Sequence, residues 1–271
     1  MKGGKKLRNE DLFSKNTPES FYWAGFIAAD GCIGKHKTVA IGLSIKDLKH
    51  LEKLRNLIDK RKNINIYKKA CKLVLSSKKM VADLERFNIT PRKTKTYVFP
   101  RWLVKHKLVN HFLRGYFDGD GSFSTQLLKG CNIKQLRFNV LGTKQFIDIY
   151  IKVLEFNCKT NFRKSTKGRG VYIFECGGNI KSRKIRDFLY KNSNENIRMD
   201  RKFNIAFSKY FVNLPLNNKS KGVIGTNIKT GKKLIFNSML EAELKGFTKQ
   251  CISACCRGIN KTHRNYKWKY I

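Results

Sequence analysis

Two nine-residue segments have nearly the same pattern, and they constrain the fold more than any other feature of the chain. They are residues 23–31 (WAGFIAADG) and residues 113–121 (LRGYFDGDG). Each is an apolar run with a small residue at its third and seventh positions, and each ends in Asp-Gly. Residues four apart share one face of a helix. Gly25 therefore lies over Ala29 in the first helix, and Gly115 lies over Gly119 in the second. Such faces let two helices cross with their backbones almost in contact.

This crossing predicts that Asp30 and Asp120, at the ends of the two helices, lie side by side. Two uncompensated carboxylates repel each other, and one of them takes up a proton. Divalent cations remove the repulsion, and carboxylate oxygens suit Mg²⁺. In the plainer interpretation each Asp-Gly is only a helix end followed by a turn. That accounts poorly for two copies 90 residues apart with the same flanking pattern, so we expect a metal site.

The two segments resemble the paired motifs of the LAGLIDADG homing endonucleases, in the single-chain form with two motifs. The family's small third residue, catalytic acid and closing glycine correspond to Gly25 and Gly115, Asp30 and Asp120, and Gly31 and Gly121. The chain departs from the motif at Trp23 (position one), Arg114 (position two) and Ala28 (position six, where the second copy has Asp118). No departure removes an acid, but together they make the two halves chemically unequal.

The resemblance implies a fold and a reaction. The fold is α+β: a duplicated αββαββα core with pseudo-twofold symmetry, whose saddle-shaped antiparallel sheets straddle double-stranded DNA, in a monomer. Asp30 and Asp120 hold Mg²⁺ or another divalent cation, one acid per strand, with the backbone carbonyls of Ala29 and Gly119 as further ligands. Cuts fall on both strands across the minor groove and leave 3′ overhangs. Lys78 and Lys181, in the second part of each repeat, are the predicted charge stabilisers.

The charge of the chain favours a nucleic-acid partner independently of the motifs. Among 271 residues, 58 are Lys or Arg and 19 are Asp or Glu, which gives a net charge of +39. A charge this large argues against an ordinary metabolic enzyme and for a polyanion partner; a ribosome-associated protein is the alternative. With 41% hydrophobic and 12% aromatic residues, the chain is too apolar for a disordered basic tail, so the charge coats a folded body.

The eight cysteines form no recognisable framework. No Cys-x-x-Cys pair occurs, and a cluster at Cys251, Cys255 and Cys256 suits buried thiols better than a metal site. Scattered cysteines favour a reducing, intracellular compartment, the cytoplasm or an organelle. No apolar run is long enough to span a membrane, and the first residues show no signal-peptide pattern.

The order of the expected elements is duplicated as well. The patterns predict helices, N-caps included, at residues 17–30, 47–58, 76–87, 103–120, 143–154 and 180–190. They predict strands at residues 39–45, 64–67, 73–75, 123–125, 136–141 and 171–175. Arg201-Lys202 follows the second series where Arg92-Lys93 follows the first. We therefore expect halves at residues 1–105 and 106–212, a linker at 213–221 and a small domain at 222–271.

A sheet that faces DNA should carry polar and basic residues at alternate positions. The predicted contacts in the two halves are Lys35, Lys37, Lys46, Lys68, Lys69, Lys72, Arg137, Asn139, Lys164, Lys167 and Arg169. For any one of these, a solvated surface residue is the plainer interpretation. As a set, they would neutralise phosphates.

The last fifty residues have the signals of a small mixed domain. A Thr230-Gly231 turn predicts a hairpin, Ser238 and Glu241 form a capping box, and a second helix is expected at residues 248–257 before a terminal strand. This stretch resembles the intron-encoded nuclease repeat, a helix-turn-helix DNA-binding module. That resemblance implies contacts from Lys249, Gln250, Ser253 and Arg257 in the major groove. The alternative is a small basic module that only stabilises the core.

Together these features predict a site-specific DNA endonuclease that makes metal-dependent double-strand cuts at a long recognition site. The alternative is a protein on the same scaffold that binds without cutting: an intron maturase, whose partner would be intron RNA, or a DNA-binding regulator.

Overall fold

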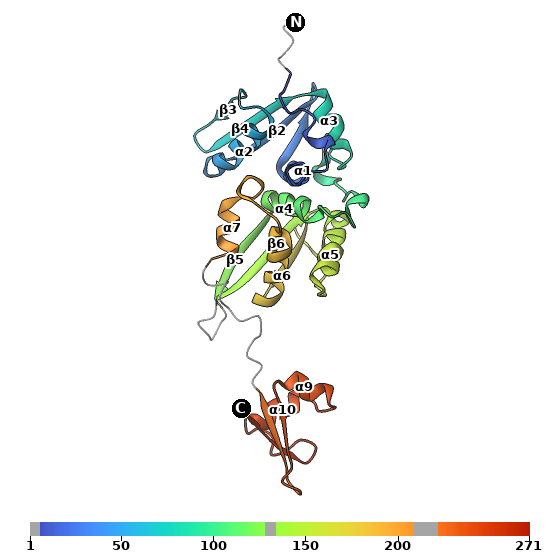
Figure 1. Ribbon diagram of the computed structural model, residues 1–271, viewed down its shortest axis with the longest axis vertical. Helices are drawn as coiled ribbons and strands as arrows, with labels where there is room; N and C mark the ends of the chain where they lie inside the picture. The colour runs from blue at the N-terminus through green and yellow to red at the C-terminus, as the bar shows by residue number, and fades with distance from the viewer. Residues whose placement is uncertain (1–5, 128–133, 209–221) are drawn as a thin grey trace. The chain divides into compact units, whose positions relative to one another are not determined.

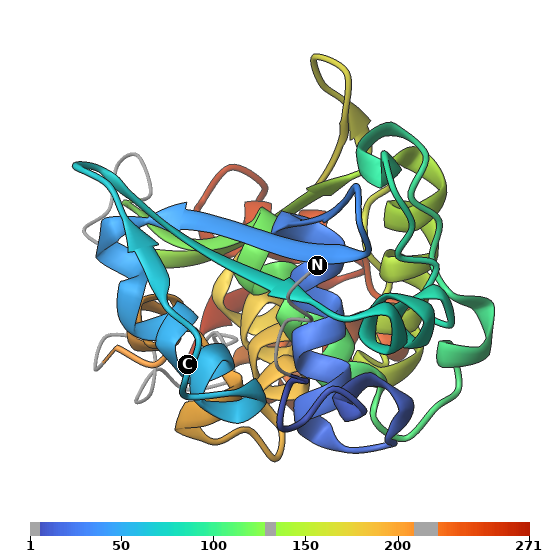
Figure 2. The ribbon, with the colours of Figure 1, turned by 90° about the horizontal axis from the view of Figure 1, so that it is seen from above.

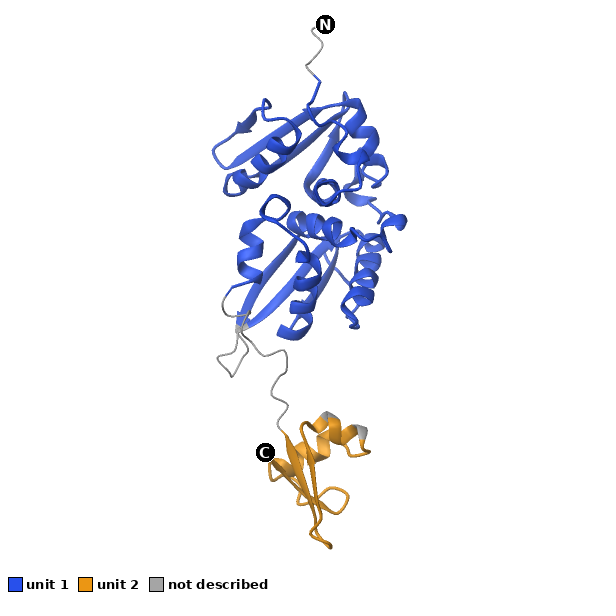
Figure 3. Ribbon diagram, viewed as in Figure 1, with its two compact units in different colours: residues 1–214 blue, residues 215–271 orange. Residues whose placement is uncertain are grey.

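The protein divides into two compact units, Met1–Leu214 and Pro215–Ile271, which Figure 3 distinguishes by colour. The computed structural model describes residues 6–127, 134–208 and 222–271. The linker expected at residues 213–221 lies outside the described residues. The boundary expected between residues 105 and 106 falls inside unit 1 and stays a prediction.

Unit 1 contains the predicted series of elements twice. The first series is α1 (Pro18–Asp30), β1 (Gly31–Gly34), β2 (Thr38–Ser44), α2 (Leu48–Ile58), β3 (Ile64–Ile66), β4 (Ala70–Ser76) and α3 (Lys78–Glu85). The second is α4 (Val109–Asp120), β5 (Gly121–Leu127), β6 (Lys134–Gly142), α5 (Lys144–Cys158), β7 (Thr166–Lys167), β8 (Tyr172–Gly177) and α6 (Asn179–Tyr190). A further helix, α7 (Asp200–Ala206), follows the second series and was not predicted. The duplicated α+β order is confirmed.

Each half builds one four-stranded antiparallel sheet, ordered β1-β2-β4-β3 in the first and β5-β6-β8-β7 in the second. In both, the first strand begins at the glycine that directly follows the motif acid, with no turn between helix and strand. Figure 1 shows α1 and α4 side by side where the halves meet, with α2 and α3 beside the first sheet and α5 and α6 beside the second. In Figure 2 the long strands of the first sheet, blue and cyan, run side by side across one end of the unit.

The contact between α1 and α4 is the most extensive between any two described elements, and glycine makes it possible. A β-carbon on Gly25 would overlap the carbonyl oxygen of Phe112, and one on Gly115 would overlap that of Tyr22. The two backbones therefore touch at both places, and no larger residue fits at either. The predicted close crossing is confirmed.

Local sequence explains where α1 begins. Thr17 accepts a hydrogen bond from the backbone N–H of Ser20 at 3.2 Å, and Pro18 occupies the first helical position. Residues 20–28 are all buried, because the helix has partners on every side; such a helix is apolar all round rather than amphipathic.

Several predicted boundaries were wrong by a few residues. The second motif helix begins at Val109 rather than at residue 103, because residues 101–103 form a separate 3-10 turn and the His106 ring accepts the N–H of Leu108. Strand β5 is longer than expected, and the short strands β1 and β7 were missed. Thr248 does not cap the helix after it with its side chain.

One continuous apolar core runs through both halves of unit 1. Large aromatic residues from α1 and α4, including Trp23, Phe26, Phe112 and Phe117, are fully buried in it. No helix in the described parts of the chain is both long and apolar enough to cross a membrane.

Unit 2 is a three-stranded antiparallel sheet with two short helices packed on it. Its elements are β9 (Val223–Asn227), β10 (Lys233–Phe236), α9 (Met239–Leu244), α10 (Lys249–Cys256) and β11 (Tyr266–Tyr270), in sheet order β10-β9-β11. The Ser238 hydroxyl accepts the N–H of Glu241, as the capping signature predicts. Its core, which includes Val223, Ile252 and Trp268, is separate from that of unit 1.

We predict that Gly115→Ala destabilises unit 1 by about 3 kcal/mol, because the added methyl must push α1 and α4 apart. Gly42→Ala is the matched control, since a β-carbon on Gly42 meets no atom within 4 Å. Urea unfolding measures both. Equal stability of the two variants would contradict the backbone contact.

Candidate active site and nucleic-acid interface

The helix pair brings the two motif acids together. Asp30 ends α1 and Asp120 ends α4, and the last turns of these helices are in contact. A β-carbon on Gly119 would lie 3.3 Å from Oδ2 of Asp30 and would overlap the side chain of Ala29. The sequence placed both acids at helix ends, and the glycine contact is what makes those ends neighbours.

The carboxyl groups are in an environment that disfavours their charge. The pKa of Asp30 is raised to about 6, first by loss of hydration and second by the negative charge of Asp120. Burial also raises the pKa of Asp120, against the opposing charges of Lys93 and Lys202. A site that resists two negative charges is one where a bound cation is favourable.

Two buried lysines lie beside these acids, one from each half. Lys93 and Lys202 are each only 5% exposed. Nζ of Lys93 donates to the carbonyl of Gly31 at 2.7 Å. Nζ of Lys202, from α7, lies within hydrogen-bond distance of four carbonyls at the end of α4. These are the carbonyls of Phe117 (3.0 Å), Asp118 (2.6 Å), Gly119 (3.2 Å) and Gly121 (2.6 Å).

Lys202 therefore caps the C-terminus of α4, where unpaired carbonyls and the helix dipole both favour a cation. Loss of hydration lowers the pKa of Lys202, and the charges of Asp118 and Asp30 oppose that shift. Lys202 stabilises the end of α4 and supplies positive charge next to the acids.

The lysines chosen from the sequence are not the ones at this site. Lys78 begins α3, and Lys181 donates to the carbonyl of Asn161 at 2.7 Å. Neither is among the main groups that shift the pKa of Asp30 or Asp120. The signal that could have found Lys93 and Lys202 is the repeated Arg-Lys pair that closes each half.

The second motif carries a buried acid that the first lacks. Asp118 accepts hydrogen bonds at Oδ2 from the Tyr22 hydroxyl (2.7 Å) and the backbone N–H of Met199 (2.8 Å). The corresponding residue of α1 is Ala28. Asp118 thus ties α4 to α1 and to the segment that leads into α7, and Lys202 balances its charge.

Arg114, the other departure in the second motif, is fully buried and serves the fold. Its guanidinium donates to the carbonyls of Ile197 (2.8 Å) and Leu189 (2.5 Å), and a third nitrogen lies 2.8 Å from Nδ1 of His111. It joins α4 to the end of α6, away from the acids.

The oxygens at the helix ends fit a divalent cation only in part. Asp30 and Asp120 supply carboxylates, and the carbonyl of Gly119 faces Lys202. Within the described residues, no group of three or more His, Cys, Asp or Glu side chains could hold a metal ion. Two carboxylates match a hard cation that takes its remaining ligands from water, carbonyls or a phosphate.

The predicted basic contacts of the first half lie mainly at the ends of the strands. Lys35 and Lys37 lie in the β1–β2 turn, Lys68 and Lys69 in the β3–β4 turn, and Lys46 in the turn after β2. Of the six, only Lys72 projects from the middle of a strand, on the exposed face of β4. This half therefore presents positive charge at the rim of its sheet.

In the second half, the predicted contacts do not lie only at strand ends. Arg137 and Asn139 project from the outer face of β6, whose other face is buried. Lys167 is on β7, and Lys164 and Arg169 are exposed in the segments around it. Polar groups here occupy the middle of the sheet as well as its edge.

In unit 2, the four predicted contacts lie along one side of α10. Lys249 and Gln250 are exposed in its first turn, and Arg257 is exposed at its end. Ser253 is half-buried, with its hydroxyl 3.4 Å from that of Tyr270. Ile252 and Cys255 are buried in the core of the unit, so the predicted residues lie on the side away from it.

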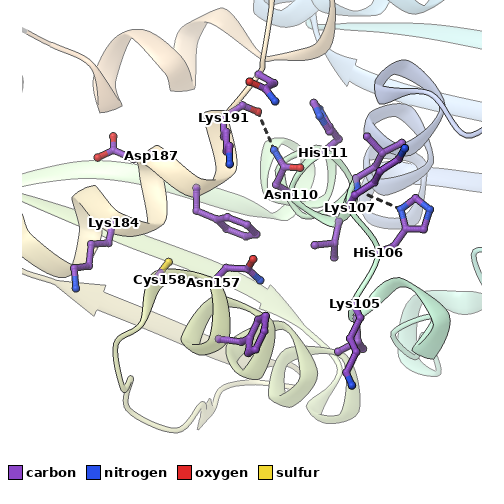
Figure 4. Close-up of a pocket in the computed structure, with 16 residues that line it drawn as sticks. Lys105, His106, Lys107, Asn110, His111, Asn157, Cys158, Lys184, Asp187 and Lys191 are labelled. Atoms are coloured by element: carbon purple, nitrogen blue, oxygen red, sulfur yellow. Dashed lines mark hydrogen bonds between the residues drawn. The ribbon is translucent and has the colours of Figure 1, made fainter.

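A separate pocket of about 570 Å³ lies at the other end of α4 (Figure 4). Lys105, Lys107 and Lys191 are among the residues that line it, and Asn110 donates to the carbonyl of Lys191 at 2.8 Å. Eleven residues of helix separate Val109 from Asp120, a rise of about 16 Å. The pocket therefore does not belong to the acid site.

No protein-family model matches the sequence, and no curated protein matches it. Solved structures that resemble it include the LAGLIDADG homing endonuclease I-GzeII in complex with its DNA target (17% identity, 70% of this chain, 88% of that chain, TM-score 0.49). Two others are LAGLIDADG meganucleases bound to uncleaved DNA. I-AabMI has 14% identity, with 70% of this chain and 87% of that chain covered and a TM-score of 0.49. I-CpaMI has 15% identity, with 70% of this chain and 90% of that chain covered and a TM-score of 0.48. Likeness at this level decides nothing about the chemistry of this chain, which rests on its own residues.

We predict that Lys202→Met lowers the free energy of unfolding of unit 1 by about 3 kcal/mol, because it leaves buried carbonyls and Asp118 without their cation. Lys93→Met is the matched variant and should cost about 1 kcal/mol, since Lys93 serves one carbonyl. Urea unfolding compares the two, and equal losses would contradict the capping role of Lys202.

Proposed function

We propose that the protein is a LAGLIDADG homing endonuclease that cuts both strands of a long DNA site by metal-dependent hydrolysis. The observation that carries the proposal is the meeting of Asp30 and Asp120 at the ends of two helices whose backbones touch. Each acid comes from one half of a duplicated fold, and a duplex offers two strands related by a twofold axis. One acid per strand is the arrangement that such a fold supplies.

The residues at the helix ends suit a divalent cation, most simply Mg²⁺. Asp30 and Asp120 would hold it, with the backbone carbonyl of Ala29 as a further ligand. The carbonyl of Gly119, the other predicted ligand, already accepts from Lys202. When bound, the cation lowers the pKa of a coordinated water and offsets charge on the leaving oxygen. The protein supplies two rigidly placed carboxylates, and Lys202 holds the end of α4 in position.

The metal-free site favours a proton on Asp30 below about pH 6. A cation must displace that proton, so cation affinity should fall as the pH drops below 6. The two carboxylates are therefore free to bind a cation at neutral pH, and protonation of Asp30 weakens that binding in acid.

The two sheets and unit 2 would form the recognition surface. The strand-end lysines of the first half and the basic edge of the second are placed to neutralise phosphates, which orient a protein on DNA without reading its sequence. The exposed side of α10 in unit 2 would extend the contact, with Lys249, Gln250 and Arg257 as the contacting residues.

We predict that Asp30→Asn and Asp120→Asn each lower double-strand cleavage at least about 100-fold while leaving DNA affinity nearly unchanged. The assay is cleavage of a randomised duplex library with Mg²⁺, followed by sequencing of the cut ends. Asp83→Asn, a half-buried acid paired with Lys79 on α3, is the control and should cut like the wild type.

Three outcomes would count against the assignment. Normal double-strand cleavage by either variant would remove the acid from the chemistry. Retention of one sequence without cutting by the wild type would instead favour a DNA-binding regulator. Preferential retention of an intron RNA over its DNA would favour a maturase.

A further inference from the structure

Helix α7 follows the second half of unit 1, but its first residues are bound to the first half. The guanidinium of Arg201 donates to both carboxylate oxygens of Asp47, at 3.1 and 3.0 Å. Nζ of Lys53 donates to Oδ2 of Asp200 at 2.7 Å and to the carbonyl of Arg198 at 3.1 Å. Asp47 directly precedes α2 and Lys53 lies within it, so two ion pairs join α2 to α7. Figure 1 shows both helices on the same side of the α1–α4 pair.

The same short segment is also bound to α4, the helix that ends in the second motif acid. The carbonyl of Ile197 accepts from Arg114 at 2.8 Å, and the N–H of Met199 donates to Asp118 at 2.8 Å. Nζ of Lys202 bonds to the carbonyls at the end of α4. Residues 197–202 therefore hold α4 on one side and α2 on the other, which places Lys202 between the two halves.

The contact between α2 and α7 uses a residue type that is scarce in this chain. Only 19 residues are acidic, against 58 that are basic, and two of the acids are Asp47 and Asp200. An acid directly before a helix commonly accepts the first free N–H groups of that helix. The Asp47 side chain accepts none from the described residues of α2. Both of its oxygens bond to Arg201, in the two-pronged geometry that makes such pairs strong.

The reciprocal contact, from the first half to the second, is made by neutral groups. Thr143 precedes α5 as Asp47 precedes α2, but Thr143 caps its own helix by accepting the N–H of Phe146 at 3.2 Å. The Thr143 hydroxyl donates to the carbonyl of Tyr97, whose ring packs against Phe146 with centroids 5.2 Å apart. Dissolved salt screens ion pairs, so it should weaken the α2–α7 contact and spare this one.

The two ion pairs are built alike, with one sheltered and one open partner. The side chains from the first half, Asp47 and Lys53, are 12% and 16% exposed. Their partners from α7, Arg201 and Asp200, are 53% and 51% exposed. Pairs as open as these each contribute modestly to stability and are sensitive to salt. The first half thus offers a fixed charge pattern, to which α7 binds reversibly.

We propose that α7 is an ionic clamp across the two halves, in which Asp47 and Lys53 are positioning residues that hold Lys202 at the end of α4, beside the acids. The effect on cutting deepens the proposed function and rests on it, whereas the contact itself does not. Because the reciprocal contact is neutral, ionic strength should loosen the centre on one side only. Loss of the clamp should therefore affect the two strand cuts unequally.

The first test is hydrogen exchange of the α7 amides in the full-length protein, at low salt and at about 0.5 M NaCl, where the Debye length is only about 4 Å. Arg201→Met should speed this exchange about fivefold at low salt, and added salt should bring the wild type toward the variant. Arg201→Lys keeps the charge and should keep most of the protection. Lys144→Met is the matched control, because it removes an ion pair with Asp148 inside α5 (2.6 Å) and should leave α7 unchanged.

The second test measures the two strand cuts separately, on a target recovered from the randomised library, with each strand labelled and protein in saturating excess. Arg201→Met should cut one strand more slowly than the other, so that nicked duplex accumulates. Loss of stability alone lowers the folded fraction and slows both cuts by the same factor. Asp47→Asn/Arg201→Met should be no worse than either single variant, because each one already removes the pair.

Unchanged exchange of α7 in Arg201→Met, or equal exchange in Arg201→Met and Lys144→Met, would overturn the clamp. Equal slowing of both cuts in Arg201→Met would overturn the positioning role. All three results leave the nuclease proposal standing if the wild type cuts. A wild type that never cuts overturns the nuclease instead, and the exchange experiment then decides the clamp by itself.

Discussion

The backbone contact between α1 and α4 is the interaction on which the rest of unit 1 depends. At Gly25 and Gly115 each helix lies against a carbonyl of the other, where even a methyl group does not fit. This contact fixes the distance between the two halves, the position of the two acids and the start of both sheets. Because each first strand follows its acid directly, the helix crossing also sets where the sheets lie relative to the carboxylates.

Bringing two helix C-termini and two acids together concentrates negative charge, and the structure offsets it from within. Lys93 and Lys202 are buried beside the helix ends, where they bond to backbone carbonyls. These lysines stabilise the helix ends but leave the Asp30 carboxyl with a raised pKa. Compensation is therefore incomplete, which is the condition under which the proposed cation would bind.

The two halves share a backbone and differ in chemistry. Asp118 and Arg114 bind the second motif helix into its surroundings, whereas the first motif helix has Ala28 and Ala24 at the equivalent places. The outward faces of the two sheets differ as well, with Ala40 and Val74 in the first half where the second has Asn139 and Glu175. Duplication accounts for the shared backbone, and divergence between the halves accounts for their different side chains.

Periodicity and capping residues were enough to predict much of unit 1. The start of α1 at Thr17-Pro18, the capped start of α5 at Thr143 and the duplicated order of elements follow from local signals. The pairing of Asp30 with Asp120 followed from the small residues, since only one helix arrangement uses them.

What the sequence did not show depends on contacts between distant residues. Lys202 lies 82 positions from Asp120, and only the fold brings α7 to the end of α4. The Arg-Lys repeat was visible, but nothing local distinguishes a buried lysine from the many exposed ones in this chain. For that reason the sequence pointed to Lys78 and Lys181, whose role as charge stabilisers stays a prediction. Likewise, which strand residues share a row depends on register, which the sequence leaves open.

The most direct test of the central claim is a ¹³C NMR titration of the Asp30 carboxyl group in the wild type and in Asp120→Asn. If the two acids meet, the pKa of Asp30 is about 6 in the wild type. It falls in the variant, because the negative charge of Asp120 has been removed while the loss of hydration stays. A pKa near the ordinary value of 3.8 in both proteins would mean that the carboxylates do not share a site, and the account of the centre would be wrong.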